Sequence, residues 1–191
     1  AKFSILDGYP DYYLDRPGAL QGGGRALDNK LFDFSILGDW ASKIRNNGMP
    51  LPMTLAETPL GGGTGIVPDE IMAERIAKDS RGFGQALVGA LLKGCLDRGI
   101  EPHLETKAKK LIKEGARITG IEIEKDGKIE TVIARRGVII ATGGFEWNKD
   151  FVSTFLRGPL NAPASPPGNN GDGLMMAQEV GASLGNMTSA W

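Results

Sequence analysis

The stretch RGVIIATGGF, from Arg136 to Phe145, contains three consecutive β-branched apolar residues that end two residues before a glycine pair. A continuous run such as Val138–Ile140 is typical of a parallel strand that is covered on both faces. Gly143 and Gly144 then allow the backbone to approach a neighbour closely, and a second glycine-rich stretch, GNNGDG, follows at Gly168–Gly173. The pattern predicts a buried strand that leads into a ligand-binding turn, with an ordinary strand-to-loop turn as the alternative.

The residues before this stretch predict an α/β arrangement. Alternating apolar residues flank an Asp126-Gly127 step, which is typical of a tight hairpin. Leucines at helical spacing predict a helix from Gly84 to Leu96 that stops at Gly99. We therefore expect strands near 102–105, 117–124, 129–135 and 137–141, and further helices at 34–44, 68–78 and 174–180.

Four segments, in this order, resemble the FAD-binding dehydrogenases related to fumarate reductase flavoproteins, and most closely the 3-ketosteroid Δ1-dehydrogenase branch. The likeness covers nearly the whole chain. The segments are GYPDYYLDRPGALQGGGRALDNKLFD from Gly8, GQALVGALLKGCLDRGI from Gly84, ARRGVIIATGGFEWN from Ala134 and PGNNGDGLMMAQEVGASLGNM from Pro167.

The resemblance implies part of a glutathione-reductase-like FAD domain, with a Rossmann-like parallel sheet and an antiparallel β excursion. Gly and Pro interrupt residues 1–80 repeatedly, so we expect a loop- and helix-rich segment there. The resemblance implies that this segment packs over the flavin domain and lines the substrate cavity. Residues 81–191 are then a portion of the FAD-binding domain, with the boundary near Ser80–Gly84.

The chain departs from the family pattern because it has no GxGxxG fingerprint after a first strand. We therefore expect it to be an internal piece of a protein that extends beyond both ends and that carries the main catalytic base elsewhere. The missing pyrophosphate site also predicts that residues 1–191 alone do not retain FAD.

Tyr12 is the candidate catalytic residue in this segment. The sequence alone favours aromatic packing for the tyrosines at positions 9, 12 and 13. In the family that the chain resembles, a tyrosine at the position of Tyr12 lines the substrate cavity and hydrogen-bonds the tyrosine that acts as base. Such a hydrogen bond stabilises the charged form of a group whose ordinary pKa is near 10.

The cofactor-binding candidates also come from the resemblance. The strand after the long helix meets the adenine through its backbone, which points to Ala108. The turn Ala141, Thr142, Gly143 and Gly144 approaches the adenosine side of the dinucleotide, and Asp172 matches an aspartate that helps to hold the flavin. A helix cap is an equal alternative for Asp172, and Asn170 stands where the family commonly has threonine.

Composition excludes several other classes of protein. The 22 Lys and Arg residues balance 23 Asp and Glu residues, so nothing attracts a nucleic acid, and the basic run Lys107–Lys113 is expected to be a solvated edge. A single Cys95 is expected to be a packed thiol, which fits a reducing, cytoplasmic location. No apolar stretch approaches the roughly 20 residues that span a bilayer.

No metal site or Ser-His-Asp system is expected. His103 is the only histidine and has no second histidine or carboxylate cluster beside it, which favours a structural or surface role. The glycine run Gly61–Gly65 follows no apolar strand and lacks a GKS ending, so a flexible loop is favoured over a phosphate cradle.

The leading hypothesis is an FAD-dependent dehydrogenase of 3-ketosteroids or similar flat cyclic ketones. The enzyme would pass the electrons from its flavin to an unidentified acceptor. A proton next to the carbonyl and a hydride from the adjacent carbon would leave together, the hydride going to flavin N5. The alternatives are a fumarate-reductase-like flavoprotein that acts on a dicarboxylate, and an inactive flavoprotein fragment. A dicarboxylate needs arginine and histidine clamps, whereas the tyrosines near the N-terminus favour an apolar substrate.

Overall fold

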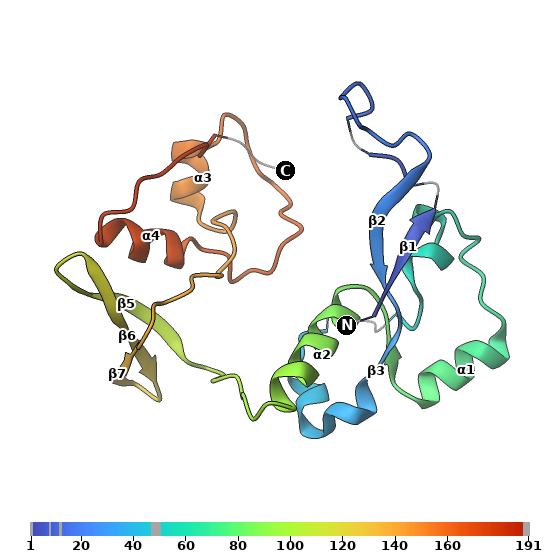
Figure 1. The fold of residues 1–191 in the computed structure, drawn as a ribbon, viewed down its shortest axis with the longest axis horizontal. Helices are drawn as coiled ribbons and strands as arrows, with labels where there is room; N and C mark the ends of the chain where they lie inside the picture. Colours follow the sequence, from blue (N-terminus) through green and yellow to red (C-terminus); the bar gives the residue numbers. More distant parts are fainter. Residues whose placement is uncertain (1, 8, 12, 47–50, 189–191) are drawn as a thin grey trace. The chain divides into compact units, whose positions relative to one another are not determined.

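The computed structural model describes residues 2–7, 9–11, 13–46 and 51–188. They form a mixed α/β chain of two compact units, one ending at Pro102 and the other beginning at His103. The units are coloured blue to green and green to red in Figure 1. The sequence placed a boundary near Ser80–Gly84 instead, but the helix that follows this position packs with the elements before it.

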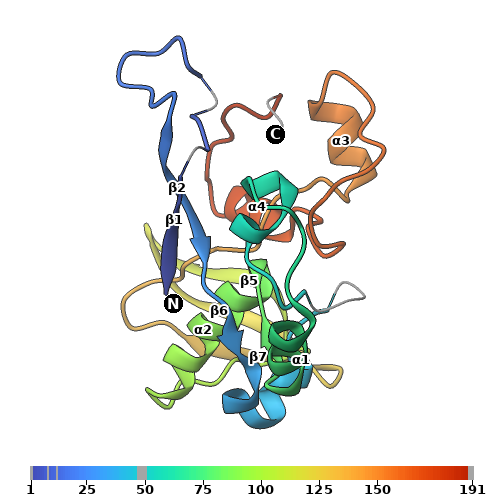
Figure 2. The ribbon, with the colours of Figure 1, turned by 90° about the vertical axis from the view of Figure 1, so that its right-hand side faces the viewer.

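The first unit contains two small antiparallel sheets and several helices. Strand β1 (Phe3–Asp7) pairs with β2 (Gly23–Asn29), and the short β3 (Phe32–Asp33) pairs with β4 (Ser80–Arg81). Two views show β1 and β2 side by side as a ribbon (Figures 1 and 2). The helical segments are the 3-10 segments η1 (Phe34–Lys43), η2 (Leu55–Glu57) and η3 (Pro59–Gly61), and the α-helices α1 (Asp69–Ala77) and α2 (Phe83–Leu96).

The core of the first unit is centred on Phe34, whose side chain is fully buried. Its ring meets Phe32 edge to face with centroids 5.8 Å apart, and the guanidinium of Arg81 lies 3.9 Å from the ring centroid. A methyl group on Gly89 of α2 would lie 2.9–3.0 Å from these two phenylalanine rings. Glycine at this position therefore lets α2 pack closely against β3 and η1.

The second unit contains a three-stranded antiparallel sheet and two helices. The sheet has the order β5 (Lys107–Glu114), β6 (Arg117–Lys125) and β7 (Lys128–Ile133), seen side by side in Figure 2. Helix α3 (Lys149–Phe155) and helix α4 (Asp172–Glu179) follow. Strand β5 contacts α4, and each supplies a buried apolar side chain, Leu111 and Met176.

Most of the predicted elements are confirmed. Asp126 and Gly127 both have positive φ angles, 50° and 73°, as the mirror-image hairpin turn between β6 and β7 requires. The helices predicted at 68–78, 84–96 and 174–180 correspond to α1, α2 and α4. The segment predicted at 34–44 is helical but forms the tighter 3-10 geometry, interrupted at Gly38.

Two predicted strands are wrong. The segment near 102–105 forms a turn, and the strand begins at Lys107. The basic run is itself this strand, at the edge of the sheet and with its lysines exposed, as the expected solvated edge requires. Residues 137–141 form no strand, and the side chain of Ile139 is 94% exposed. A parallel strand needs a neighbour that takes up its N–H and C=O groups, and all strand pairs among the described residues are antiparallel.

In the glycine run that the sequence predicted to be a loop, Gly61 ends a 3-10 segment and residues 62–65 form turns and loop that are hydrogen-bonded to residues 57–59. The segment 54–65 folds into η2 and η3, and the N–H groups of Gly61 and Gly63 donate to the carbonyl of Thr58 at 3.0 and 2.8 Å. The backbone of Leu55 and Ala56 lies against Gly61 so closely that no side chain fits. Glycine is needed here for internal packing.

Candidate functional site

The two glycine-rich stretches of the sequence lie together in the second unit. The N–H of Gly171 donates to the carbonyl of Gly144 at 3.0 Å, and the N–H of Trp147 donates to the carbonyl of Asn169 at 3.1 Å. The side-chain amide of Asn148 reaches the carbonyl of Asn170 at 3.0 Å. These hydrogen bonds hold residues 144–148 against residues 169–171.

We call residues 141–144 the glycine turn. Ala141, Thr142, Gly143 and Gly144 are all exposed, and Gly143 has a φ of 76°, which favours glycine. Within the described residues, no hydrogen bond uses the N–H groups of residues 142–144. The glycine turn therefore presents backbone donors at the surface of this unit.

Helix α4 begins directly beside the glycine turn. Gly171 is its N-cap with a φ of 79°, and Asp172 is its first residue. A methyl group on Gly173 would overlap the side chains of Thr142 and Ile140, so glycine lets the first turn of α4 pack against the strand-like segment. No side chain caps the helix, so the alternative role of Asp172 as a cap is not what the structure contains.

The start of β5 contacts the first residue of α4 through a long side chain. The ammonium group of Lys107 lies 3.9 Å from Oδ2 of Asp172. Ala108, the next residue, is half-buried and pairs with Ile123 of β6. The predicted cofactor-binding residues thus belong to one unit, on three neighbouring elements (Figure 1).

Sequence reasoning missed a polar pair behind the glycine turn. The side-chain amide of Asn169 donates to Oε1 of Glu146 at 2.8 Å, and both side chains are half-buried. Hydrogen bonds from Ser165 and then from Asn169 lower the pKa of Glu146 below its ordinary value. The only signal in the sequence is the proximity of these polar residues to the two glycine motifs, which does not reveal that they meet.

An aromatic group lies beneath the same loops. Phe145, Phe151 and Phe155 meet edge to face, with ring centroids 5.7–5.9 Å apart. A methyl group on Gly171 would lie 2.9 Å from the ring of Phe151 and 3.1 Å from Cβ of Phe145. Helix α3 therefore supports the loops from the side opposite to solvent.

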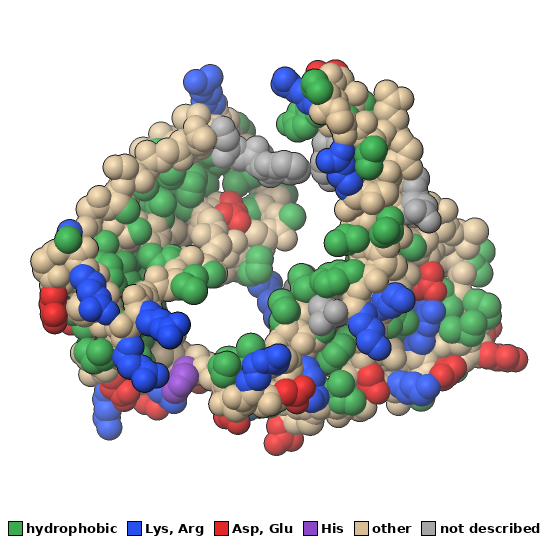
Figure 3. Space-filling view, viewed as in Figure 1, with side chains coloured by type: hydrophobic (Ala, Val, Ile, Leu, Met, Phe, Trp, Pro, Cys, Tyr) green, Lys and Arg blue, Asp and Glu red, His purple; other side chains and the backbone are tan. Residues whose placement is uncertain are grey.

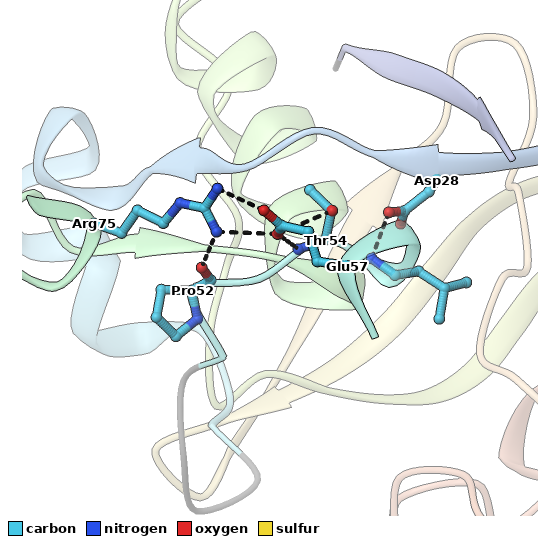
Figure 4. A network of polar contacts seen from close by, with 6 residues as sticks. Asp28, Pro52, Thr54, Glu57 and Arg75 are labelled. Atoms are coloured by element: carbon cyan, nitrogen blue, oxygen red, sulfur yellow. Dashed lines mark hydrogen bonds and ion pairs between the residues drawn. The ribbon is translucent and has the colours of Figure 1, made fainter. Parts of the chain in front are cut away.

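The first unit contains a separate polar network, drawn in Figure 4. Both oxygens of Glu57 accept hydrogen bonds from Arg75, at 2.7 and 3.0 Å, and Arg75 also donates to the carbonyl of Pro52. Oε2 of Glu57 accepts further bonds from the N–H and hydroxyl of Thr54. The hydrogen bond from Arg75, assisted by those from Thr54, lowers the pKa of Glu57.

The buried carboxylate of Asp28 extends this network to β2. Its Oδ2 accepts a hydrogen bond from the N–H of Leu55 at 2.6 Å, at the start of η2. Together with the Glu57–Arg75 ion pair, this contact fixes segment 54–65 to both β2 and α1. The network is a stabilising element rather than a site that is open to a ligand.

The remaining candidates are placed as follows. Tyr12 lies outside the described residues. Its neighbour Asp11 accepts a hydrogen bond from the N–H of Leu20 and forms an ion pair with Arg25. His103, purple in Figure 3, is exposed, and Cys95 is a free, half-buried thiol. Among the described residues, no group of three His, Cys, Asp or Glu residues is arranged to hold a metal ion. None of the helices in that part of the chain is long and apolar enough to cross a membrane.

Residues 21–191 match the family model described as FAD binding domain. The chain is 35% identical over 99% of its length to 4-oxocyclohexanecarboxylate 2-dehydrogenase of Sinomonas cyclohexanicum, and 30% identical over 100% of its length to 3-oxosteroid 1-dehydrogenase of Mycobacterium tuberculosis. It also matches the crystal structure of 3-ketosteroid delta1-dehydrogenase from Sterolibacterium denitrificans in complex with 1,4-androstadiene-3,17-dione, with a TM-score of 0.81 and 32% identity over 100% of this chain. The chain spans only 33%, 38% and 38% of these three proteins.

Proposed function

The chain belongs to the FAD-binding domain family, and from this membership we propose that the protein that carries it is an FAD-dependent dehydrogenase of a cyclic ketone. The sequence prediction of FAD as cofactor and of a flavoprotein related to 3-ketosteroid dehydrogenases is confirmed.

The observation that carries the proposal is that the two kinds of relative share one reaction pattern. The names describe a 4-oxo ring dehydrogenated at carbon 2 and a 3-oxo ring dehydrogenated at carbon 1. In both, the new double bond joins the carbon next to the ketone and the carbon beyond it. The carbonyl acidifies the first of these carbons, so a base removes its proton, and bound FAD supplies the hydride acceptor for the second.

The residues of the second unit fit the adenosine side of such a cofactor. The glycine turn presents exposed backbone donors and the first turn of α4 lies beside it, which suits a polar, anionic dinucleotide. In the proposal Ala141, Thr142, Gly143 and Gly144 bind through the backbone, Asp172 holds the flavin part, and Ala108 meets the adenine.

The finer fold assignment belongs to the same proposal. Residues 137–141 form no strand in the structure of this chain, and we place them in a glutathione-reductase-like parallel sheet only in the full-length protein, where further strands would pair with them. The support is the exposure of Ile139, an apolar residue of high β propensity that directly precedes the glycine turn. We also propose a cytoplasmic location for the protein.

The first unit is assigned to the substrate side. Residues 1–80 would line the cavity, where Tyr12 would donate a hydrogen bond to a tyrosine base supplied by another part of the protein. The competing role for Tyr12 is that of an apolar wall, in which only its ring matters. The two roles differ in what Tyr12→Phe does to turnover.

A steady-state assay of the full-length protein tests the function. It uses an oxidised artificial electron acceptor with androst-4-ene-3,17-dione and with 4-oxocyclohexanecarboxylate, and a reduced artificial electron donor with fumarate. We expect reduction of the acceptor with one of the two ring ketones and no oxidation of the donor with fumarate. Activity on fumarate alone would favour the dicarboxylate alternative, and a flavin-loaded protein that is inactive on all three would favour an inactive flavoprotein.

A further inference from the structure

We propose that Glu146 and Asn169 are positioning residues that set the conformation of the glycine turn for FAD binding. This inference rests on the proposed function, because it assigns a role to residues that would act on the cofactor through the turn. Neither residue belongs to the set that the sequence resemblance assigns to the cofactor.

The first step is that Glu146 and Asn169 join the two loops through two side chains, whereas the contacts of Gly171, Trp147 and Asn148 each use at least one backbone group. Nδ2 of Asn169 lies 2.8 Å from Oε1 of Glu146. The carbonyl of Asn169 also accepts the N–H of Trp147, the residue directly after Glu146. Asn169 therefore contacts the 144–148 loop at two adjacent residues, which fixes the register of the two loops.

The second step is that these side chains lie against the glycines of the turn. A methyl group on Gly143 would lie 2.5 Å from Oδ1 and 2.7 Å from Cγ of Asn169. A methyl group on Gly144 would overlap Oε2 of Glu146. The side chains of Glu146 and Asn169 thus fill the space on one side of the glycine pair. The other side of the pair is exposed to solvent.

The third step concerns the backbone of the turn. Gly143 adopts a φ of 76° and a glycine has more conformational freedom than any other residue, so a glycine pair alone does not hold one conformation. The side chains behind it restrict that freedom before a ligand arrives. A turn that is already ordered loses less entropy on binding, and its affinity is higher.

The charge on Glu146 matches this arrangement. Ser165 and Asn169 direct neutral donors at its carboxylate, and these hydrogen bonds favour the ionised form. A hydrogen bond with one ionised partner is stronger than a neutral one. The Glu146–Asn169 hydrogen bond is therefore a charge-assisted one, next to the glycine turn, and its donor is a neutral amide rather than a cation.

The test measures FAD affinity of the full-length protein after removal of its flavin. Asn169→Ala removes the donor, and we expect the Kd for FAD to rise roughly tenfold, which equals about 1.4 kcal/mol of binding free energy. At saturating FAD the turnover number should stay within about twofold, because the variant loses binding rather than a group at the reacting atoms. Asn161→Ala, an exposed asparagine of the same unit, is the control and should leave the Kd unchanged.

A charge exchange provides the rescue. Asn169→Asp alone places a second carboxylate next to that of Glu146. Because the two like charges repel, this variant should weaken FAD binding more than Asn169→Ala does. Adding Glu146→Gln to Asn169→Asp restores an amide-to-carboxylate hydrogen bond with the donor on the other residue, and the Kd should return toward that of the unmodified protein. Glu179→Gln, at the exposed end of α4, is the control for the glutamate change.

Three outcomes overturn the inference. If the variants lower the melting temperature of the flavin-free protein but bind FAD as tightly as the unmodified protein, the pair has a purely structural role. If the double variant binds no better than Asn169→Asp, the pair does not act through its hydrogen bond. If the unmodified protein binds no FAD, both this inference and the proposed function are wrong, whereas the first two outcomes leave the proposed function intact.

Discussion

Each of the two units contains a half-buried glutamate that fixes an irregular loop, but the partners of the two glutamates differ. Glu57 in the first unit is held by the guanidinium of Arg75 and by a threonine cap, as Figure 4 shows. Glu146 in the second unit is held by the neutral donors of Asn169 and Ser165. The first arrangement anchors a closed segment, and the second lies behind an exposed turn.

The difference shows how stability and binding are divided between the units. An ion pair with two hydrogen bonds is the stronger anchor, and segment 54–65 packs so tightly that no side chain fits at Gly61 or Gly63. A carboxylate held by neutral donors fixes its loop without a cation, and the N–H groups of the turn stay available. We therefore expect substitutions in the first unit to change mainly stability and those in the second to change mainly FAD binding.

The largest effect is expected from Gly61→Ala, which would sharpen this view of the first unit as a rigid anchor. The added methyl group would overlap backbone atoms of Leu55, which cannot rotate away. Overpacking of this kind costs about 3 kcal/mol or more in the free energy of unfolding. Urea denaturation checks it, with Gly22→Ala, whose methyl group meets no atom within 4 Å, as the control. A loss for Gly61→Ala no larger than that for the control would contradict the packing of segment 54–65.

Glu57→Gln should destabilise the first unit by about 1.5–3 kcal/mol at neutral pH, because it weakens a charge-assisted hydrogen-bond network and leaves Arg75 without its counter-ion. The pKa of Glu57 in the folded protein lies below its ordinary value of 4.5. The stabilisation is therefore complete above this value and is lost as the pH falls through the lower, folded-state pKa.

Denaturation of the unmodified protein and of Glu57→Gln at neutral and acidic pH measures this effect. The difference between them should shrink as the pH falls, whereas Glu101→Gln, at an exposed position near the end of the first unit, should differ little from the unmodified protein at either pH. A constant difference would mean that the charge of Glu57 contributes nothing.

Tyr12→Phe tests whether the first unit does more than support the fold. If Tyr12 donates to a tyrosinate base, the loss of one hydrogen bond to a charged group should lower turnover roughly tenfold to a hundredfold and leave the melting temperature unchanged. The test measures the turnover of a 3-ketosteroid and the melting temperature for both Tyr12→Phe and Tyr12→Ala. Full activity of Tyr12→Phe, together with destabilisation in Tyr12→Ala, would leave Tyr12 as a wall of the cavity.

The smallest effect is expected for Lys107→Ala. The ion pair with Asp172 spans 3.9 Å and its lysine side chain is 62% exposed, so water and salt screen it. We expect a change of about 0.5 kcal/mol or less in the free energy of unfolding. Urea denaturation at low and high salt measures it, and a loss well above 1 kcal/mol on this scale would show that the start of β5 holds α4 more firmly than the geometry indicates.

Local patterns in the sequence predicted the elements that depend on local chemistry. The Asp126-Gly127 step located the hairpin because its backbone needs two positive φ angles. Leucine spacing located α2, and the acids after Pro68 located α1. The contact between the glycine turn and the start of α4, made by the hydrogen bond from Gly171 to Gly144, was not predicted from the sequence.

Features that depend on distant partners could not be predicted from the sequence. Strand β5 was not predicted because its many lysines give it no apolar pattern. It forms because it pairs with β6 and contacts α4. Residues 137–141 have the composition of a strand, but strand formation needs a neighbour. The Glu146–Asn169 pair joins residues that are far apart in the chain, and no local pattern indicates it.

Hydrogen exchange of the full-length protein with and without FAD tests the central claim most directly. If the glycine turn and the start of α4 hold the dinucleotide, FAD should slow exchange in peptides that cover 141–148 and 168–175. Peptides that cover segment 54–65 should change little. A protein that binds FAD without protection of 141–148 would contradict the assignment of the cofactor to this turn.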